Sequence, residues 1–296
     1  MSKKNQRLLQ LLQQSFVQPQ LSFSDLPQFR QQLSVGLQEY SSVFNSVFLG
    51  AQAATPGMAF LAGYQNTIRC LDSDCPVDQL AAFCVSEKGV KKPWDMASQL
   101  TQNAQGYALN GQKGYVMLLP HELDRLYVIA KSDEQLKCVF FSAGIQGLTT
   151  TDSLKAPFIE DVPHSGVSFE NVLIPESQMM PIDGHKGANK PFRYWEDMHV
   201  SLAMMAWMAR EAYENGKTLQ QFESLTEQMC QLIENFEEQP DYYSAEVFPL
   251  LDQSQEILEF HSKLLSESSQ KAWQKDRLLL QMGQKIRHLV RAKMAL

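Results

Sequence analysis

The sequence has 296 residues and a mass of 33.6 kDa, which corresponds to about two domains with a substantial hydrophobic core. Hydrophobic residues make up 44% of the chain and charged residues 20%, which excludes small disulfide-bonded scaffolds and intrinsically disordered proteins. The formal charge of -7 argues against a surface that binds nucleic acid, so we expect no nucleic-acid partner.

The N-terminal part of the chain has the apolar spacing of helices. Leu8, Leu11, Leu12 and Phe16 follow this spacing, and similar patterns continue to about residue 80. The segment 22–27 reads SFSDLP and supplies residues that favour a helix N-cap. We therefore predict a helical N-terminal domain over residues 1–80.

The middle of the chain consists of short β-prone runs separated by turns. Strands at this spacing, with few helical stretches, are typical of an antiparallel sandwich or barrel, which we place at residues 81–182. Asn110-Gly111 is the sharpest hairpin signal, because both central positions of a type I′ turn need a positive φ. The predicted strands are residues 83–85, 106–109, 115–118, 126–130, 139–142, 166–169 and 172–174.

Helical spacing returns after residue 187 and predicts a C-terminal helical bundle over residues 188–296. Its first helix begins near Phe192, and later helices cover residues 219–238, 245–266 and 270–295. The last of these combines basic side chains with an apolar stripe. It is either a core helix with a solvated basic face or a docking surface for an anionic partner.

Several classes of site have no sequence support. The five cysteines are odd in number and form no C-x-x-C pair, which indicates reduced thiols. The six histidines show no zinc-site spacing, so we expect no metal. No stretch approaches about 18 uninterrupted apolar residues, and the apolar stretch at 8–14 is too short and glutamine-rich for a signal. We therefore expect a cytoplasmic location without a membrane span.

Four segments resemble motifs of the acyl-CoA dehydrogenase family. The segment 83–87, FCVSE, looks like the family's aromatic-x-hydrophobic-[Ser/Thr]-Glu strand, and 95–98, DMAS, looks like the tail of its Gly-Ser-Asp loop. The segment 106–116, GYALNGQKGYV, is similar to the hairpin that ends in Trp-Ile-Thr. The segment 166–176, GVSFENVLIPE, is similar to the strand that closes the β-domain. The matches span about residues 78–188 in the family's order.

The resemblance implies an α+β multidomain fold with a helical N-terminal domain, a central antiparallel β-barrel and a C-terminal helical bundle. FAD would lie between barrel and bundle. By position, Phe83, Val85 and Ser86 would contact the flavin, and Tyr115 stands at the place of the family's tryptophan. The alternative interpretation is that these four residues form a barrel core with one satisfied hydroxyl and bind no flavin.

The catalytic base implied by the resemblance is a carboxylate at the start of the first helix after the barrel. One branch of the family has Glu-Arg there, whereas this chain has Met198-His199. Glu196 and Asp197 lie within one turn, and Glu196 is the candidate base. Its alternative role is that of an acidic residue favoured by the helix dipole.

The sequence also departs from the family pattern. Pro93-Trp94 replaces the Gly-Ser before the aspartate and follows an extended KGVKK run at 88–92, and Met117 replaces a threonine. Proline has no N–H to donate and a thioether is a poor substitute for a hydroxyl, so the cofactor side is altered. The chain is also shorter than the family at both ends of the strand region.

Three functions remain open at this point. The first is an FAD-dependent oxidoreductase of fatty acid metabolism that acts on the CH-CH group of an acyl thioester, either as a homo-oligomer or with an active homologue. The second is a non-catalytic homologue that has lost FAD and serves as a binding or scaffold subunit. The third is a flavin-independent protein that binds an acyl chain or acyl carrier. Function has to be decided from the site, since all three share the fold.

Overall fold

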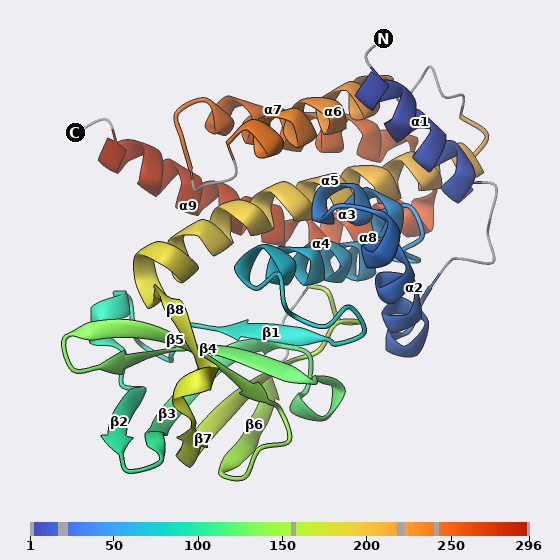
Figure 1. Ribbon diagram of the computed structural model, residues 1–296. Coiled ribbons are helices and arrows are strands. Elements are labelled where there is room, and N and C mark those ends of the chain that lie inside the picture. Colours follow the sequence, from blue (N-terminus) through green and yellow to red (C-terminus); the bar gives the residue numbers. More distant parts are fainter. Residues whose placement is uncertain (1–2, 17–22, 155–157, 218–222, 240–242, 295–296) are drawn as a thin grey trace. The chain divides into compact units, whose positions relative to one another are not determined.

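The computed structural model describes residues 3–16, 23–154, 158–217, 223–239 and 243–294 (Figure 1). The chain divides into two compact units. The helical unit comprises residues 1–70, 157–161 and 193–296, and the strand unit comprises residues 71–156 and 162–192. The part of the chain that the structure describes contains no helix that could span a membrane.

The described residues of the N-terminal part of the helical unit form four helices. The predicted N-cap at 22–27 is confirmed, because the side chain of Asp25 accepts a hydrogen bond from the amide of Gln28 at 2.9 Å. The helices are α1 (Lys3–Phe16), α2 (Leu26–Glu39), α3 (Ser42–Gly50) and α4 (Pro56–Leu71).

The C-terminal part of the same unit is built around the long helix α5 (Lys190–Glu214). Residues 198–210 of α5 are all buried, as is typical of a central helix. The predicted helix 270–295 is divided at Arg277, and its first part begins earlier because Ser266 caps it. The remaining helices are α6 (Glu223–Glu238), α7 (Val247–His261), α8 (Glu267–Asp276) and α9 (Leu278–Met294).

The short segment 157–161 belongs to the helical unit although its chain neighbours belong to the strand unit. Asp276 of α8 accepts a hydrogen bond from the amide of Ile159 at 2.7 Å, and the hydroxyl of Thr55 donates to Asp161. Lys275 forms an ion pair with Glu160. These contacts hold the segment against the helices.

The described residues of the strand unit form an eight-stranded sheet. Its order is β6-β7-β3-β2-β4-β5-β8, and β1 pairs with β4 beside this path. The pairs are antiparallel as predicted except for β1 with β4 and β2 with β4, which are parallel. The strands are β1 (Ala81–Cys84), β2 (Gln99–Asn103), β3 (Gly106–Met117), β4 (Arg125–Ser132), β5 (Gln135–Ser142), β6 (Leu148–Leu154), β7 (His164–Ile174) and β8 (Met179–Asp183).

The hairpin predicted at Asn110-Gly111 is wrong. Strand β3 runs straight through this dipeptide, which forms a bulge opposite β7, and Gly111 has a φ of 139°. The side chain of Asn110 exchanges hydrogen bonds with Asn171 of β7. The turn between β2 and β3 lies at residues 104–105 instead, next to Gly106 with a φ of 127°.

Strands β2, β6 and β8 were not predicted. Strand β2 reads QLTQN and buries only Leu100, so it lacks the apolar alternation of a half-buried strand. Strand β8 contains Pro181, which weakens the strand signal, and has only two positions in register with β5.

Helix α5 approaches α3 and α4 at two glycines. A Cβ atom on Gly50 would lie 2.2 Å from the carbonyl oxygen of Ala203, and one on Gly63 would lie 2.6 Å from Cα of Val200. The opposing atoms are backbone and cannot move like a flexible side chain. These positions therefore require glycine because of close packing.

We predict that Gly63→Ala lowers the free energy of unfolding by about 2 kcal/mol or more, because the added methyl group forces α4 away from α5. Chemical denaturation measures this change. Gly144→Ala is the matched control, since its nearest contact would be Ser142 Oγ at 3.8 Å, and its effect should stay within about 0.5 kcal/mol. A Gly63→Ala protein as stable as the control would contradict the packing interpretation.

Candidate functional site

A buried lysine connects separate segments of the strand unit. The side chain of Lys113 on β3 is fully buried, and its ammonium group lies 2.7 Å from Oε1 of Glu87 and 3.2 Å from the carbonyl oxygen of Val85. Lysine is rarely buried unless it is paired. Lys113 therefore ties β3 to the segment that follows β1.

Glu87 extends this connection to the loop before β2. Its carboxylate accepts hydrogen bonds from the amides of Ala97 at 2.6 Å and Ser98 at 3.1 Å. Burial raises the pKa of Glu87, but the bonds from Lys113, Ala97 and Ser98 outweigh it and leave the pKa below its ordinary value. Glu87 is therefore ionised at neutral pH, and it binds the C-terminal end of the loop that precedes β2.

Two of the predicted flavin contacts take part in packing. Phe83 is half-buried, and its ring lies against that of Phe192 with the ring centroids 4.3 Å apart. Val85 is also half-buried, and its carbonyl accepts from Lys113. Both residues form the surface of the sheet at the end of β1.

The other two predicted contacts are exposed beside each other. The amide of Gly114 donates to the carbonyl of Ser86 at 2.8 Å, which brings Ser86 next to Tyr115. The side chain of Tyr115 is 70% exposed, and its φ of 56° lies in the left-handed region that costs a non-glycine residue roughly 1–2 kcal/mol. Backbone strain of this kind is concentrated at functional sites.

These groups fit the ring part of a flavin. Such a ring needs an aromatic side chain beside it and hydrogen-bond donors near its polar edge, which Tyr115 and the Ser86 hydroxyl offer. The amides of Ala97 and Ser98 do not contribute, because Glu87 already binds them. Two residues differ from the family's motifs here. Met117, which stands at the place of a threonine, is buried, and Trp94 is 51% exposed.

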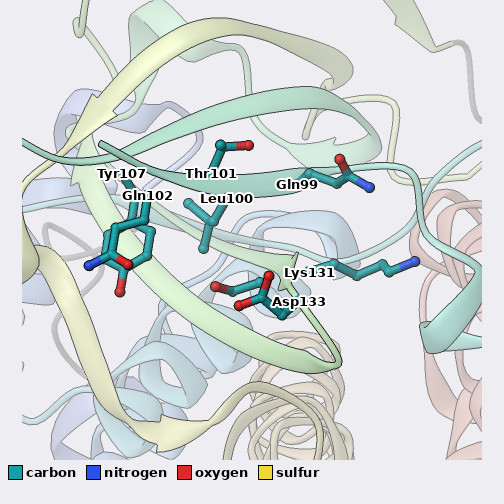
Figure 2. Close-up of a pocket in the computed structure, with 8 residues that line it drawn as sticks. Gln99, Leu100, Thr101, Gln102, Tyr107, Lys131 and Asp133 are labelled. Atoms are coloured by element: carbon teal, nitrogen blue, oxygen red, sulfur yellow. The ribbon is translucent and has the colours of Figure 1, made fainter. Parts of the chain in front are cut away.

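A separate polar cleft of about 380 Å³ lies in the strand unit (Figure 2). It opens because β2 pairs with β4 only at Gln99 and Lys131. Residues 99–102, Tyr107 and residues 131–133 line it. The ammonium group of Lys131 points away from the carboxylate of Asp133 (Figure 2). Sequence reasoning missed this cleft because it did not find β2.

The candidate base Glu196 lies in the first turns of α5. Its carboxylate is half-buried and forms no hydrogen bond or salt bridge with a described residue, and burial followed by the charge of Asp197 raises its pKa to about 7. Asp197 is engaged instead, because Tyr243 donates to it and Arg287 lies 3.0 Å away. Asp197 is occupied by these two bonds, so Glu196 is the better candidate for proton transfer.

His199, at the place of the family's Glu-Arg pair, has a structural environment. Its Nε2 lies 2.9 Å from Ser42 Oγ and its Nδ1 lies 2.6 Å from the carbonyl oxygen of Trp195. Burial lowers its pKa to about 4, so the ring is neutral at pH 7. It accordingly acts as a hydrogen-bonding group of the helical core.

Comparison with models of known protein families finds no match, and comparison with curated protein sequences finds none. Solved structures do match. Apo-form PigA has a TM-score of 0.65 at 15% identity, over 89% of this chain and 86% of that chain. Glutaryl-CoA dehydrogenase from Mycobacterium smegmatis has 0.66 at 13%, over 91% and 86%. An acyl-CoA dehydrogenase complexed with FAD from Bacillus anthracis has 0.69 at 15%, over 95% and 64%. The predicted acyl-CoA dehydrogenase-like fold is confirmed.

We predict that Glu87→Gln lowers the free energy of unfolding by about 3–5 kcal/mol, because it leaves the Lys113 ammonium buried without a counter-charge. Denaturant titration of Glu87→Gln, Lys113→Met and the double variant measures the coupling between the two side chains. The double variant should be less destabilised than the sum of the single variants.

The matched control for this cycle is the exposed pair of Lys275 with Glu160, whose Glu160 side chain is 67% exposed. Glu160→Gln should cost less than about 1 kcal/mol. If Glu87→Gln and Glu160→Gln lower the free energy of unfolding equally, Lys113 does not need the charge of Glu87 in order to be buried.

Proposed function

We propose that the protein is an FAD-dependent oxidoreductase that acts on the CH-CH group of an acyl thioester. The observation that carries the proposal is the exposed Tyr115 ring beside Ser86, held outward by a left-handed backbone on an acyl-CoA dehydrogenase-like fold. The similar Bacillus anthracis protein is complexed with FAD, which supports the same cofactor here. Fold alone does not decide function, so the side chains carry the proposal.

Tyr115, Ser86 and Val85 hold the cofactor in this proposal. With FAD bound, the Tyr115 ring would lie beside the flavin ring, and the Ser86 hydroxyl would donate a hydrogen bond to its polar edge. Phe83, two residues before Val85, packs against Phe192. Bound FAD supplies the acceptor for the hydride that leaves the β-carbon of the substrate.

Glu196 supplies the base. Its carboxylate takes the α-proton of the acyl thioester, and the electron pair of that C–H bond forms the new double bond as the hydride leaves the β-carbon. A carboxylate with a pKa of about 7 is well matched to this task, because about half of it is ionised at pH 7 and it binds a proton readily.

The second candidate is a non-catalytic homologue without FAD that serves as a binding or scaffold subunit. One observation favours it. The amides of Ala97 and Ser98, in the segment that looks like the family's Gly-Ser-Asp loop, are bonded to Glu87, and Trp94 stands where the family has a small residue. Both features remove donors from the cofactor side.

We predict that the purified protein, incubated with FAD and freed of excess ligand, shows flavin absorbance between 350 and 500 nm. Tyr115→Ala and Ser86→Ala should each weaken FAD affinity about tenfold, since each removes one contact to the ring. Tyr107→Ala in the separate cleft is the control and should leave affinity unchanged. A protein that stays colourless after incubation supports the non-catalytic candidate instead.

We predict that turnover of an acyl thioester rises with pH through about 7, because Glu196 accepts a proton only when ionised. Glu196→Gln should lower turnover by about 10²–10⁴-fold and keep bound FAD, as absorbance will show. Glu227→Gln on the exposed face of α6 is the control. If Glu196→Gln keeps the turnover and the pH profile of the unaltered protein, Glu196 is not the base.

A further inference from the structure

We propose that helix α9 is a docking surface for a helix of a partner protein, and that this partner helix has an apolar stripe flanked by acidic side chains. The surface, called the α9 stripe, consists of Leu278, Met282, Lys285, Leu289 and Lys293. The sequence leaves two roles open for this segment, a core helix with a basic face or a docking surface. The burial of its side chains decides between them.

Helix α9 has its apolar side chains in solvent. Of its seventeen residues, all of which the structure describes, only Arg287 is buried. Leu278, Met282 and Leu289 are 39%, 51% and 65% exposed. A surface helix of a globular protein ordinarily has the opposite arrangement, with apolar side chains against the core and cations in water. The described part of the chain therefore leaves the apolar face of α9 uncovered.

The buried arginine fixes this orientation. Arg287 Nη1 lies 3.0 Å from Oδ2 of Asp197 on α5, and Arg287 Nε lies 3.8 Å from Oδ1 of Asp252 on α7. Because separating a buried cation from its carboxylates is costly, α9 cannot rotate to bury its apolar residues instead. At about 100° per residue, positions 278, 282 and 289 lie on one face, opposite Arg287. They form a stripe that is held toward solvent.

The charges beside the stripe are all positive. Lys285 and Lys293 lie on its two sides, are exposed, and form no ion pair with a described residue. Helix α9 contains no aspartate or glutamate. Exposed apolar residues with a polar rim mark interaction surfaces, and charges beside an apolar stripe pair with opposite charges of a facing helix. The complementary surface is therefore apolar with carboxylates beside it.

Two other occupants fit the charges less well. A second copy of α9 would bring lysines against lysines, because α9 has no carboxylate. A flat anionic membrane would also cover the neighbouring groove of about 680 Å³ between α7 and α9, where Glu256 and Glu259 would meet its headgroups. A helix about 10 Å wide covers the stripe without covering α7. A partner helix is the occupant that satisfies both observations.

The test uses a fluorescein-labelled synthetic helix of three heptads, with leucine at positions a and d and glutamate at positions e and g. A second peptide has lysine at e and g. Like charges keep each peptide from pairing with itself. Fluorescence anisotropy at low salt should show saturable binding of the glutamate peptide, at least about tenfold tighter than that of the lysine peptide, and added salt should weaken it.

Variants of the stripe separate the apolar from the charged contribution. Met282→Gln with Leu289→Gln should weaken binding of the glutamate peptide about tenfold or more, because the partner loses its apolar contacts. Lys285→Gln with Lys293→Gln should weaken it several-fold and reduce its dependence on salt.

The matched controls carry the same kinds of substitution elsewhere on the surface. Val35→Gln replaces a 42% exposed valine of α2, and Lys92→Gln replaces an exposed lysine of the strand unit. Neither should change the affinity for the glutamate peptide. All substituted side chains are exposed, and circular dichroism verifies the fold of each variant.

Several results would overturn the proposal. One is binding of the glutamate peptide that is absent, equal to that of the lysine peptide, or unchanged in the Met282→Gln, Leu289→Gln variant. Another is binding to phosphatidylglycerol vesicles that this variant loses, which would assign the stripe to a membrane. A third is self-association in sedimentation velocity that this variant loses, which would assign it to a second copy. Failure of the protein to bind FAD leaves the proposal standing, because α9 carries none of the candidate flavin contacts.

Discussion

The strand unit depends on the need to neutralise one buried ammonium group. Lys113 has no exposed surface and finds its counter-charge in Glu87. Because that carboxylate also binds the amides of Ala97 and Ser98, one interaction fixes β3, the end of β1 and the loop that carries Trp94. The low polarity around Lys113 makes the arrangement specific, since an unpaired charge there is costly.

The candidate flavin contacts and the loop before β2 are connected through the backbone around Glu87. The amide of Gly114 donates to the carbonyl of Ser86 and brings Ser86 next to Tyr115, and Glu87 binds the amides of Ala97 and Ser98. The residues that differ from the acyl-CoA dehydrogenase motif, Trp94 and the basic run before it, come just before the amides that Glu87 binds. An exposed aromatic ring and positive charges stand here where that motif has small hydrogen-bond donors.

Much of the fold could be predicted because the apolar periodicity of the helices and central strands is strong. The N-cap at Asp25 and the course of β4 and β5 follow from local sequence. The hairpin at Asn110-Gly111 was predicted wrongly because a β-bulge and a tight turn need the same residue types. Only the pairing of β3 with β7 distinguishes the two. The polar strand β2 carries no periodic signal. Glu196 could be proposed as the base from its position in the sequence. That Asp197, its neighbour, is bonded to Arg287 could not be predicted, because Arg287 lies ninety residues later.

The segment 157–161 determines where the chain can be divided into fragments. The polypeptide passes between its two units repeatedly, and this short segment leaves the sheet to bond with Asp276 and Thr55 before returning. An excised sheet region would carry the buried amide of Ile159 without its acceptor. A fragment cut out as residues 71–192 would therefore keep this segment and lose the partners that it binds in the helical unit.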